Sequence, residues 1–433
     1  MKSSGRHISA FRFDISAFWD YNILKEKNGR RSLNTEVNMK FGYFTVGSAC
    51  FFSVVFSAEA CTSWVLRPEE TQSGRMIIQK ILDERYTPRL DADIRVAPNG
   101  WRWIRIGRNA HGASMTMNEK GVALTTNSAD RNGENRPFYG ERHAMGSGEL
   151  QRLVAKNCAT AAEGVELVKR AARNRLFVYS SINFGTILLI ADAHRAFLVE
   201  IGDGYAESYE ITNGIHVATN TWRLPGGEVV SECDFPGVRG DRARYDCAVK
   251  SLREKRVDGK YTVRGCFDTS RNIRRRQFVE RHPFVPGNPK SKFMSLETTC
   301  FEIDAEFPAF LSCAYISLGP QRHMVYLPVA MAVKQLPDKM RDGRWGKMAY
   351  DHQAAFGPEH ADLPKIAALE DKFLAEFTTV RDRARELLRD GKKAEAVKLL
   401  NDCFDRQYAE ADELMTSLQT AAQEKLKTAH KAE

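Results

Sequence analysis

Cys61 is the residue whose type and position could most readily do chemistry. It follows residues 41–57, which carry no charge, and the small-residue triplet at 58–60. Cleavage after Ala60 leaves a chain that begins with Cys61. An N-terminal cysteine carries a thiol and a free α-amine on one residue, so the amine can act as base for its own thiol. The position therefore predicts a nucleophile.

The segment before Cys61 has the plan of a secretory signal peptide. Met39 and Lys40 give a short positive start, and the apolar run and small residues follow. We expect synthesis to begin at Met39, residues 1–60 to be absent from the mature protein, and the protein to be secreted or periplasmic. Two alternatives stay open. One is an uncleaved membrane anchor; the other is a lipoprotein, although its −3 residue would be Leu-like and here is Ala58.

An N-terminal thiol needs a carboxylate to hold its amine and a cation to favour the thiolate. Lys80 and Asp83 supply these two side-chain types. If Thr62–Leu66 pairs with an expected strand at 75–80 as a hairpin, the end of the second strand returns close to Cys61. The hairpin therefore places both charges within reach of the thiol.

Two asparagines stand at the ends of expected strands. Asn127 closes a strand at 122–126, and Asn220 closes a strand at 216–219. An asparagine at a strand end is commonly a turn former. Its amide is also a good donor to an oxyanion that develops during acyl transfer.

Composition bounds the remaining functions. The chain has 433 residues, of which 43% are hydrophobic, and a net charge of +9 that is interspersed, so we infer no nucleic-acid partner. Nine cysteines are present, and in an exported protein some of them can pair; Cys233/Cys247 and Cys300/Cys313 have hairpin-like separations, but the sequence assigns no bonds. The sequence lacks CxxC, HxxxH, GxGxxG and P-loop patterns, so we expect no metal and no organic cofactor.

Alternation of apolar residues predicts short antiparallel strands with interposed helices, an α+β pattern. Beyond those named, strands are expected at 101–106, 184–190, 196–201, 300–304, 309–318 and 323–327, a hairpin at 113–127, and helices at 148–173 and 241–252. From about residue 363 the spacing predicts two amphipathic helices separated by Asp390 and Gly391. This helical hairpin either packs on the main domain or serves as a lid or an oligomerisation element, so a homo-oligomer is left open.

Four motifs in this order resemble the N-terminal-nucleophile amidohydrolases. They lie at residues 61–63, at 80–83, at 117–123 with Asn127, and at 218–221. The similar groups are the choloylglycine hydrolase/penicillin V acylase family and the acyl-CoA:6-aminopenicillanate acyltransferase-like peptidases; residues 187–200 also resemble the second group. The resemblance spans about 61–330. It implies a four-layer αββα sandwich over 61–360, followed by the helical hairpin at 361–433.

The resemblance also implies roles for six residues. Cys61 is the nucleophile and, through its amine, the base; Asp83 holds the amine and Lys80 tunes the thiol. Asn127 and Asn220 lie on the oxyanion side, and Arg244 supports the site. The usual Arg-Asn-x-Asp motif is here Lys-Ile-Leu-Asp at 80–83, and the hairpin turn is longer than in the bile-salt enzymes. Both departures put bile-salt specificity in doubt.

The sequence thus predicts an exported hydrolase that cleaves a linear C–N amide bond of a small molecule or short peptide. Its membrane contact is limited to the signal segment. A dipeptidase or an acyltransferase of the same fold is an alternative. A lipid-anchored binding protein without catalysis, with the C-terminal helices as its interface, is another.

Overall fold

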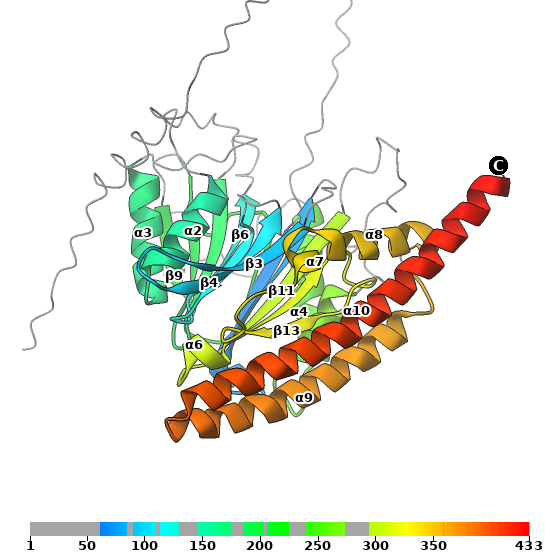
Figure 1. Ribbon diagram of the computed structural model, residues 1–433. Coiled ribbons are helices and arrows are strands. Elements are labelled where there is room, and N and C mark those ends of the chain that lie inside the picture. Colours follow the sequence, from blue (N-terminus) through cyan, green and yellow to red (C-terminus); the bar gives the residue numbers. More distant parts are fainter. Residues whose placement is uncertain are drawn as a thin grey trace, which may run out of the picture. The chain divides into compact units, whose positions relative to one another are not determined.

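The computed structural model describes residues 61–84, 90–108, 113–129, 146–174, 185–202, 206–224, 239–272, 294–357 and 359–432. The signal-like segment lies outside them. Two antiparallel sheets contact each other face to face, and helices cover their outer faces (Figure 1). This arrangement confirms the expected α+β sandwich of antiparallel sheets with a C-terminal helical region.

The first sheet has six strands in the order β10-β1-β2-β11-β12-β13. Their bounds are β1 Thr62–Leu66, β2 Met76–Glu84, β10 Ile215–Ala218, β11 Met294–Ile303, β12 Cys313–Leu318 and β13 Leu327–Ala330. Strand β1 lies between two antiparallel neighbours, since Ser63 pairs with Ala218 on one side and with Lys80 on the other. The predicted first hairpin is therefore present.

The second sheet has seven strands in the order β3-β4-β5-β6-β7-β8-β9. Their bounds are β3 Leu90–Val96, β4 Arg102–Arg108, β5 Met115–Asn118, β6 Ala123–Ala129, β7 Gly185–Ala191, β8 Ala196–Ile201 and β9 Ala206–Glu210. On β7, Leu188 and Ile190 face the helical layer, whereas Ile187 and Leu189 join the core between the sheets. Burial on both faces explains why this strand is an unbroken apolar run.

The turn between β5 and β6 is the predicted hairpin. The Asn118 side chain accepts hydrogen bonds from the backbone N–H groups of Lys120 and Val122, at 3.0 Å each. Gly121 has a φ of +81°, and a β-carbon there would lie 3.0 Å from the Ile303 side chain. Glycine therefore meets both the backbone conformation and the space at this turn.

Helices α2 (Ser147–Asn157) and α3 (Ala161–Arg173) cover the seven-stranded sheet, and α4 (Arg239–Glu254) and α5 (Val263–Ser270) contact the six-stranded sheet. The predicted single helix at 148–173 is wrong in one respect, because a break separates α2 from α3. Thr160 caps α3 by accepting a hydrogen bond from the backbone N–H of Glu163. A cap of this kind starts a new helix.

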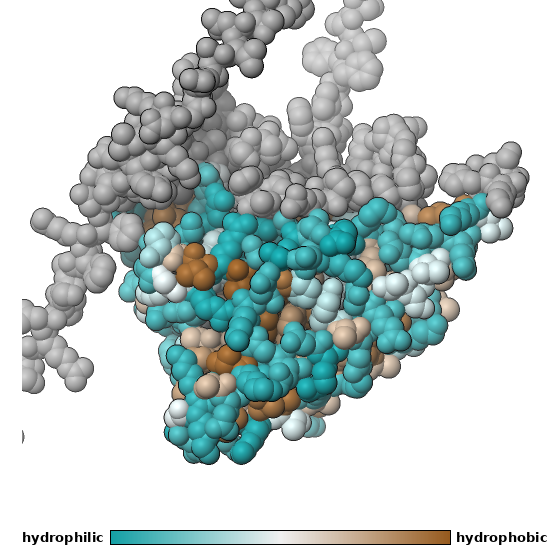
Figure 2. Space-filling model, viewed as in Figure 1, coloured by the Kyte–Doolittle hydropathy of each residue, from teal (hydrophilic) through white to brown (hydrophobic). Residues whose placement is uncertain are grey.

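The C-terminal helical hairpin is confirmed. It consists of α9 (Leu363–Arg389) and α10 (Lys393–Ala432), which contact each other and β13, and α8 (Arg344–Phe356) contacts α10. Gly391, with a φ of +77°, lies at the predicted break. Figure 2 shows mostly hydrophilic residues over the outer side of these helices. Within the described part of the chain, every helix is too short or too polar to cross a membrane.

Two predicted strands are wrong. Residues 309–318 begin with the short helix α6 (Pro308–Leu311) and only then enter β12, because proline is well placed in the first turn of a helix. Residues 323–326 form a buried loop, and only Leu327 of the predicted strand lies in a strand, as the first residue of β13. There the backbone N–H of Tyr326 donates to the Glu370 carboxylate at 2.8 Å rather than to a neighbouring strand. Another short helix, α7 (Asp338–Arg341), precedes α8.

Candidate active site

The strand register brings Cys61 and Asn220 together. Ser63 lies opposite Ala218 in the β1–β10 pair, and continuing this register by two residues places Asn220 opposite Cys61. On the other side Thr62 pairs with Ile81, so Leu82 lies opposite Cys61. The C-terminal ends of β10 and β2 thus both lie beside the N-terminal end of β1. The antiparallel topology therefore gathers residues from distant parts of the sequence around one thiol.

Arg244, on α4, joins Cys61 to Asn220. Its guanidinium donates to the carbonyl oxygen of Cys61 at 2.5 Å, to the hydroxyl of Thr62 at 3.2 Å and to Oδ1 of Asn220 at 2.7 Å. The side chain is 2% exposed. A planar guanidinium with several donors can hold all three acceptors at once. Arg244 therefore fixes Asn220 relative to Cys61.

The amide of Asn220 has a defined orientation. Its Oδ1 faces the Arg244 donor, and its Nδ2 donates to the carbonyl oxygen of Ser128 at 2.6 Å. Exchanging the two atoms would oppose donor to donor and acceptor to acceptor, so the assignment is unambiguous. Nδ2 carries a second hydrogen, and this hydrogen is the one suited to an oxyanion.

Lys80 and Asp83 are both buried on β2, at 2% and 7% exposure. The ammonium of Lys80 donates to the backbone carbonyl of Thr126 in the facing sheet. The carboxylate of Asp83 accepts from the hydroxyl of Ser295 at 2.5 Å, beside an irregularity in the β2–β11 register. Ser63, directly opposite Lys80, shares its face of the sheet. The strand places Cys61 on the same face as Ser63, because side chains alternate.

Asn127 lies on the facing sheet and ties it to β1. Its Oδ1 accepts from the hydroxyl of Ser63 at 2.7 Å, and its Nδ2 donates to the carbonyls of Ala218 and Thr219 at 3.1 and 3.0 Å. Both amide hydrogens thus have backbone acceptors. This geometry favours a role in positioning the ends of β1 and β10 over the donor role that the resemblance implies for Asn127.

The segment after Asn220 is held by the seven-stranded sheet. The buried carboxylate of Glu200 accepts from the backbone N–H groups of Arg223 and Leu224, at 2.5 and 2.9 Å. A β-carbon on Gly185 would lie 2.0 Å from a ring carbon of Trp222. Glycine at 185 therefore lets the Trp222 ring pack directly on β7. No local pattern predicts this support, because the contacts join β7 and β8 to a loop farther along the chain.

Burial raises the pKa of Glu200 from 4.5 to about 7, although the two N–H donors and Arg223 oppose the shift. The unfolded chain loses this proton near pH 4.5, while the folded chain keeps it until about pH 7. Folding stability from this group is therefore lost as pH rises through that window, by roughly 3 kcal/mol. We expect Glu200→Gln to lack this loss. Urea unfolding of both proteins at pH 5 and 7.5 measures it, and parallel pH profiles would contradict the prediction.

Four other cysteines of the described chain show no sign of activation. Burial raises the pKa of Cys158 and of Cys403 to about 12, and it raises those of Cys300 and Cys313 further. Cys300 and Cys313, one of the hairpin-like pairs, are free thiols. Cys233 of the other pair lies outside the described residues. The thiols of Cys158, Cys300, Cys313 and Cys403 therefore remain protonated at neutral pH.

Comparisons with known proteins concern the architecture. Neither a family model nor a curated protein matches the sequence. Two crystal structures of conjugated bile acid hydrolase variants from Clostridium perfringens are similar at 12% identity, with TM-scores of 0.40 and 0.39. They cover 59% and 62% of this chain and 88% and 92% of their own. Penicillin V acylase from Agrobacterium tumefaciens has 16% identity, a TM-score of 0.38, and coverage of 62% and 86%. This similarity is one of fold alone.

Proposed function

We propose that the mature chain is a cysteine amidohydrolase with Cys61 as its N-terminal nucleophile, acting on a linear acyl-amide C–N bond. The observation that supports this most strongly is the convergence at the start of β1. There Arg244 bridges the Cys61 carbonyl and the Asn220 amide in a buried setting. A fixed amide beside a thiol is the arrangement that acyl transfer requires.

In the proposed reaction the α-amine of Cys61 takes the thiol proton, and the sulfur attacks the substrate carbonyl carbon. The second amide hydrogen of Asn220 stabilises the oxyanion. The C–N bond then breaks, the leaving nitrogen receives the proton from the α-amine, and a thioester remains on Cys61. Water attacks the thioester, gives a proton back through the amine, and releases the carboxylic acid.

The same site performs acyl transfer if an amine replaces water, and a dipeptidase would use the same steps on a peptide bond. We propose a small-molecule amide or short peptide as substrate and an exported location. The signal-like segment supports the exported location, and the resemblance of the four motifs supports the substrate class.

The intact mass and N-terminal sequence of the exported protein test the proposal. We expect a chain that begins at an unmodified Cys61 and is alkylated there faster than at Cys158 or Cys403, whose pKa values are raised to about 12. A chain that begins elsewhere, or a lipid-modified Cys61, lacks the free amine and would sink the mechanism. It would favour the non-catalytic binding protein instead.

Replacing Asn220 with alanine is expected to lower kcat by roughly 10²- to 10³-fold with little change in KM, because an oxyanion donor acts mainly in the transition state. Steady-state kinetics on an acyl-amide substrate measure it. Asn157→Ala is the matched control, since Asn157 donates only to the carbonyl of Leu153 near the end of α2 in the described contacts. Equal kinetics for the two variants would remove Asn220 from the reaction.

A further inference from the structure

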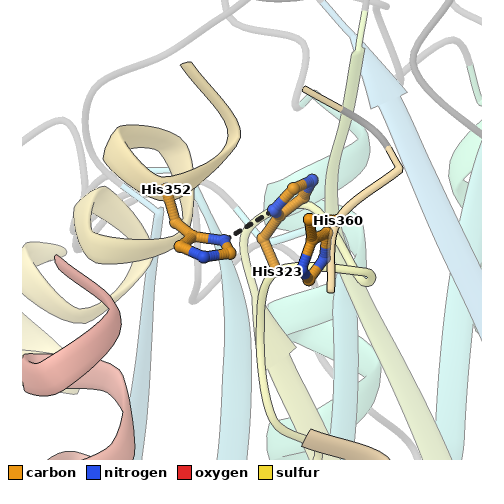
Figure 3. A group of neighbouring side chains, drawn as sticks. All are labelled: His323, His352 and His360. Atoms are coloured by element: carbon orange, nitrogen blue, oxygen red, sulfur yellow. Dashed lines mark hydrogen bonds between the residues drawn. The ribbon is translucent and has the colours of Figure 1, made fainter. Parts of the chain in front are cut away.

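Three histidines from different elements meet on the C-terminal side of the six-stranded sheet. His323 lies in the buried loop between β12 and β13, His352 on α8, and His360 just before α9. One ring nitrogen from each lies within 4.8 Å of the others. Figure 3 shows the three rings grouped together, with His323 and His352 joined by a hydrogen bond. The residues are separated by 29 and 8 positions, so local spacing motifs do not reveal them.

Neighbouring acceptors fix the protonation of two of the rings. Nε2 of His352 lies 3.3 Å from the Asp362 carboxylate, and Nε2 of His360 lies 2.6 Å from the carbonyl oxygen of Arg322. Each Nε2 must therefore carry the proton, which leaves a lone pair on Nδ1 in the neutral ring. A carboxylate or carbonyl behind a histidine in this way is the usual outer support of a metal ligand.

The nitrogens on the inner side of the cluster are poorly satisfied. Nδ1 of His323 lies 2.9 Å from Nδ1 of His352, where a single proton can be shared. Among the described residues, Nδ1 of His360 and Nε2 of His323 are buried without a hydrogen-bond partner. Buried polar atoms without partners are rare in folded proteins and often indicate an ion or water.

Burial and nearby positive charges both lower the pKa values of the three rings and so favour their neutral form. Burial lowers the pKa of His323, of His352 and of His360, the last to about 4, and each ring is also near other positive groups. The groups that act on the rings are Arg271, Arg322, Asp362, Lys365 and Lys425. Only the Asp362 carboxylate and, at His360, the backbone carbonyl of Arg322 favour the charged form among these groups. Neutral imidazole at neutral pH is the form that binds metal.

We propose that His323, His352 and His360 bind a divalent transition-metal ion of the Zn²⁺ class, with water as a fourth ligand. Ligand nitrogens of a tetrahedral zinc site lie about 3.3 Å apart, and the present separations run from 2.9 Å up to 4.8 Å, so small side-chain shifts suffice. His352 and His360 bind through Nδ1. His323 binds through the nitrogen that faces them, and if this is Nδ1 the shared proton moves to its Nε2.

The metal fastens α8 and the start of α9 to the loop before β13. Tyr350, two residues before His352 on α8, packs in the same apolar cluster as Cys61 and Leu82. The ion thus stabilises one wall behind the proposed nucleophile without taking part in the reaction. This inference does not depend on the proposed function, because it concerns binding and stability only.

Zinc binding to the purified, chelator-treated full-length protein tests the proposal. Calorimetric titration with ZnCl₂ is expected to show one site per chain with a Kd below about 1 µM. Co²⁺ should give visible absorption bands of a four-coordinate nitrogen and oxygen site. The thermal midpoint should rise when Zn²⁺ is added, because the ion binds only the folded chain.

Variants separate this site from adventitious binding. His352→Ala and His360→Ala should each weaken Zn²⁺ binding at least about 100-fold, and Asp362→Asn by roughly 10- to 100-fold through loss of ring orientation. His194→Ala, at an exposed turn between β7 and β8, is the control and should bind as the parent does. If a histidine variant fails to fold, Asp362→Asn retains all three imidazoles, and its Zn²⁺ affinity still tests the proposal. No saturable binding to the parent, or equal binding by His352→Ala or Asp362→Asn, overturns the proposal.

Discussion

Replacing Cys61 with alanine is expected to abolish hydrolysis of acyl-amide substrates, with kcat reduced on the order of 10⁴- to 10⁶-fold. The physical reason is that this variant lacks the thiol that forms the thioester in the proposed mechanism. Cys61→Ser keeps a nucleophilic atom at the same position, but its hydroxyl loses a proton far less readily than a thiol does, so it should retain only traces of activity. Initial rates on a panel of amides, with the N-terminus of each variant verified, measure both effects.

The control for Cys61 is another buried cysteine. Cys158→Ala removes a thiol at the end of α2, in the layer between helices and the seven-stranded sheet, and should leave kcat unchanged. Cys61 packs in a small apolar cluster with Leu82, Leu90, Leu296 and Tyr350, and alanine keeps an apolar side chain there, so the variant should still fold. A folded Cys61→Ala protein with full activity would falsify the nucleophile assignment.

Replacing Glu370 with glutamine is expected to cost about 3–5 kcal/mol of unfolding free energy. Glu370 lies on α9 at 0% exposure and binds Arg271 through two parallel hydrogen bonds of 2.6 Å. It also accepts from Arg264 at 3.1 Å and from the backbone of Tyr326 at 2.8 Å. Removing its charge leaves the buried guanidinium of Arg271 without an anionic partner. Urea unfolding at constant pH measures the loss.

The same helix supplies the control for Glu370. Glu376 pairs with Arg406 of α10 at 2.6 Å, but the two side chains are 26% and 56% exposed. Exposed ion pairs contribute at most about 1 kcal/mol, so Glu376→Gln should change stability little. The double variant with Arg271→Met and Glu370→Met removes both buried charges and should recover part of the loss. Similar values for the two single variants would show that Arg271–Glu370 is not a buried anchor of α9.

The sequence predicted much of what lies around β1. Alternation in Thr62–Leu66, and a second strand shortly after it, were enough to predict the β1–β2 hairpin that carries Lys80 and Asp83. The two long C-terminal helices followed from apolar spacing at three and four residues. These successes share a cause, because the relevant pattern is local in each case and burial on one face repeats with the period of the element.

The failures share a different cause. Residues 323–326 are as apolar as a strand, but the backbone N–H of Tyr326 donates to Glu370, which comes more than forty residues later. The amide of Asn127 was expected to serve an oxyanion, yet the contacts that engage it come from Ser63 on the other sheet and from the end of β10. The histidine cluster likewise depends on three elements meeting. Side-chain partners across such distances are set by the tertiary fold, which no local pattern records.

The position of β1 between two partner strands also determines when the protein can finish folding. Ser63 pairs with Ala218, and Ile81 on the next strand pairs with Thr298, so each pairing closes a loop of more than 150 residues. Non-local pairings of this kind form late and slowly. A chain that emerges from a ribosome or a translocation channel therefore releases Cys61 long before Ala218 and Thr298, and it assembles the surroundings of that thiol late. The nascent protein cannot have a finished site until nearly the whole six-stranded sheet has been delivered.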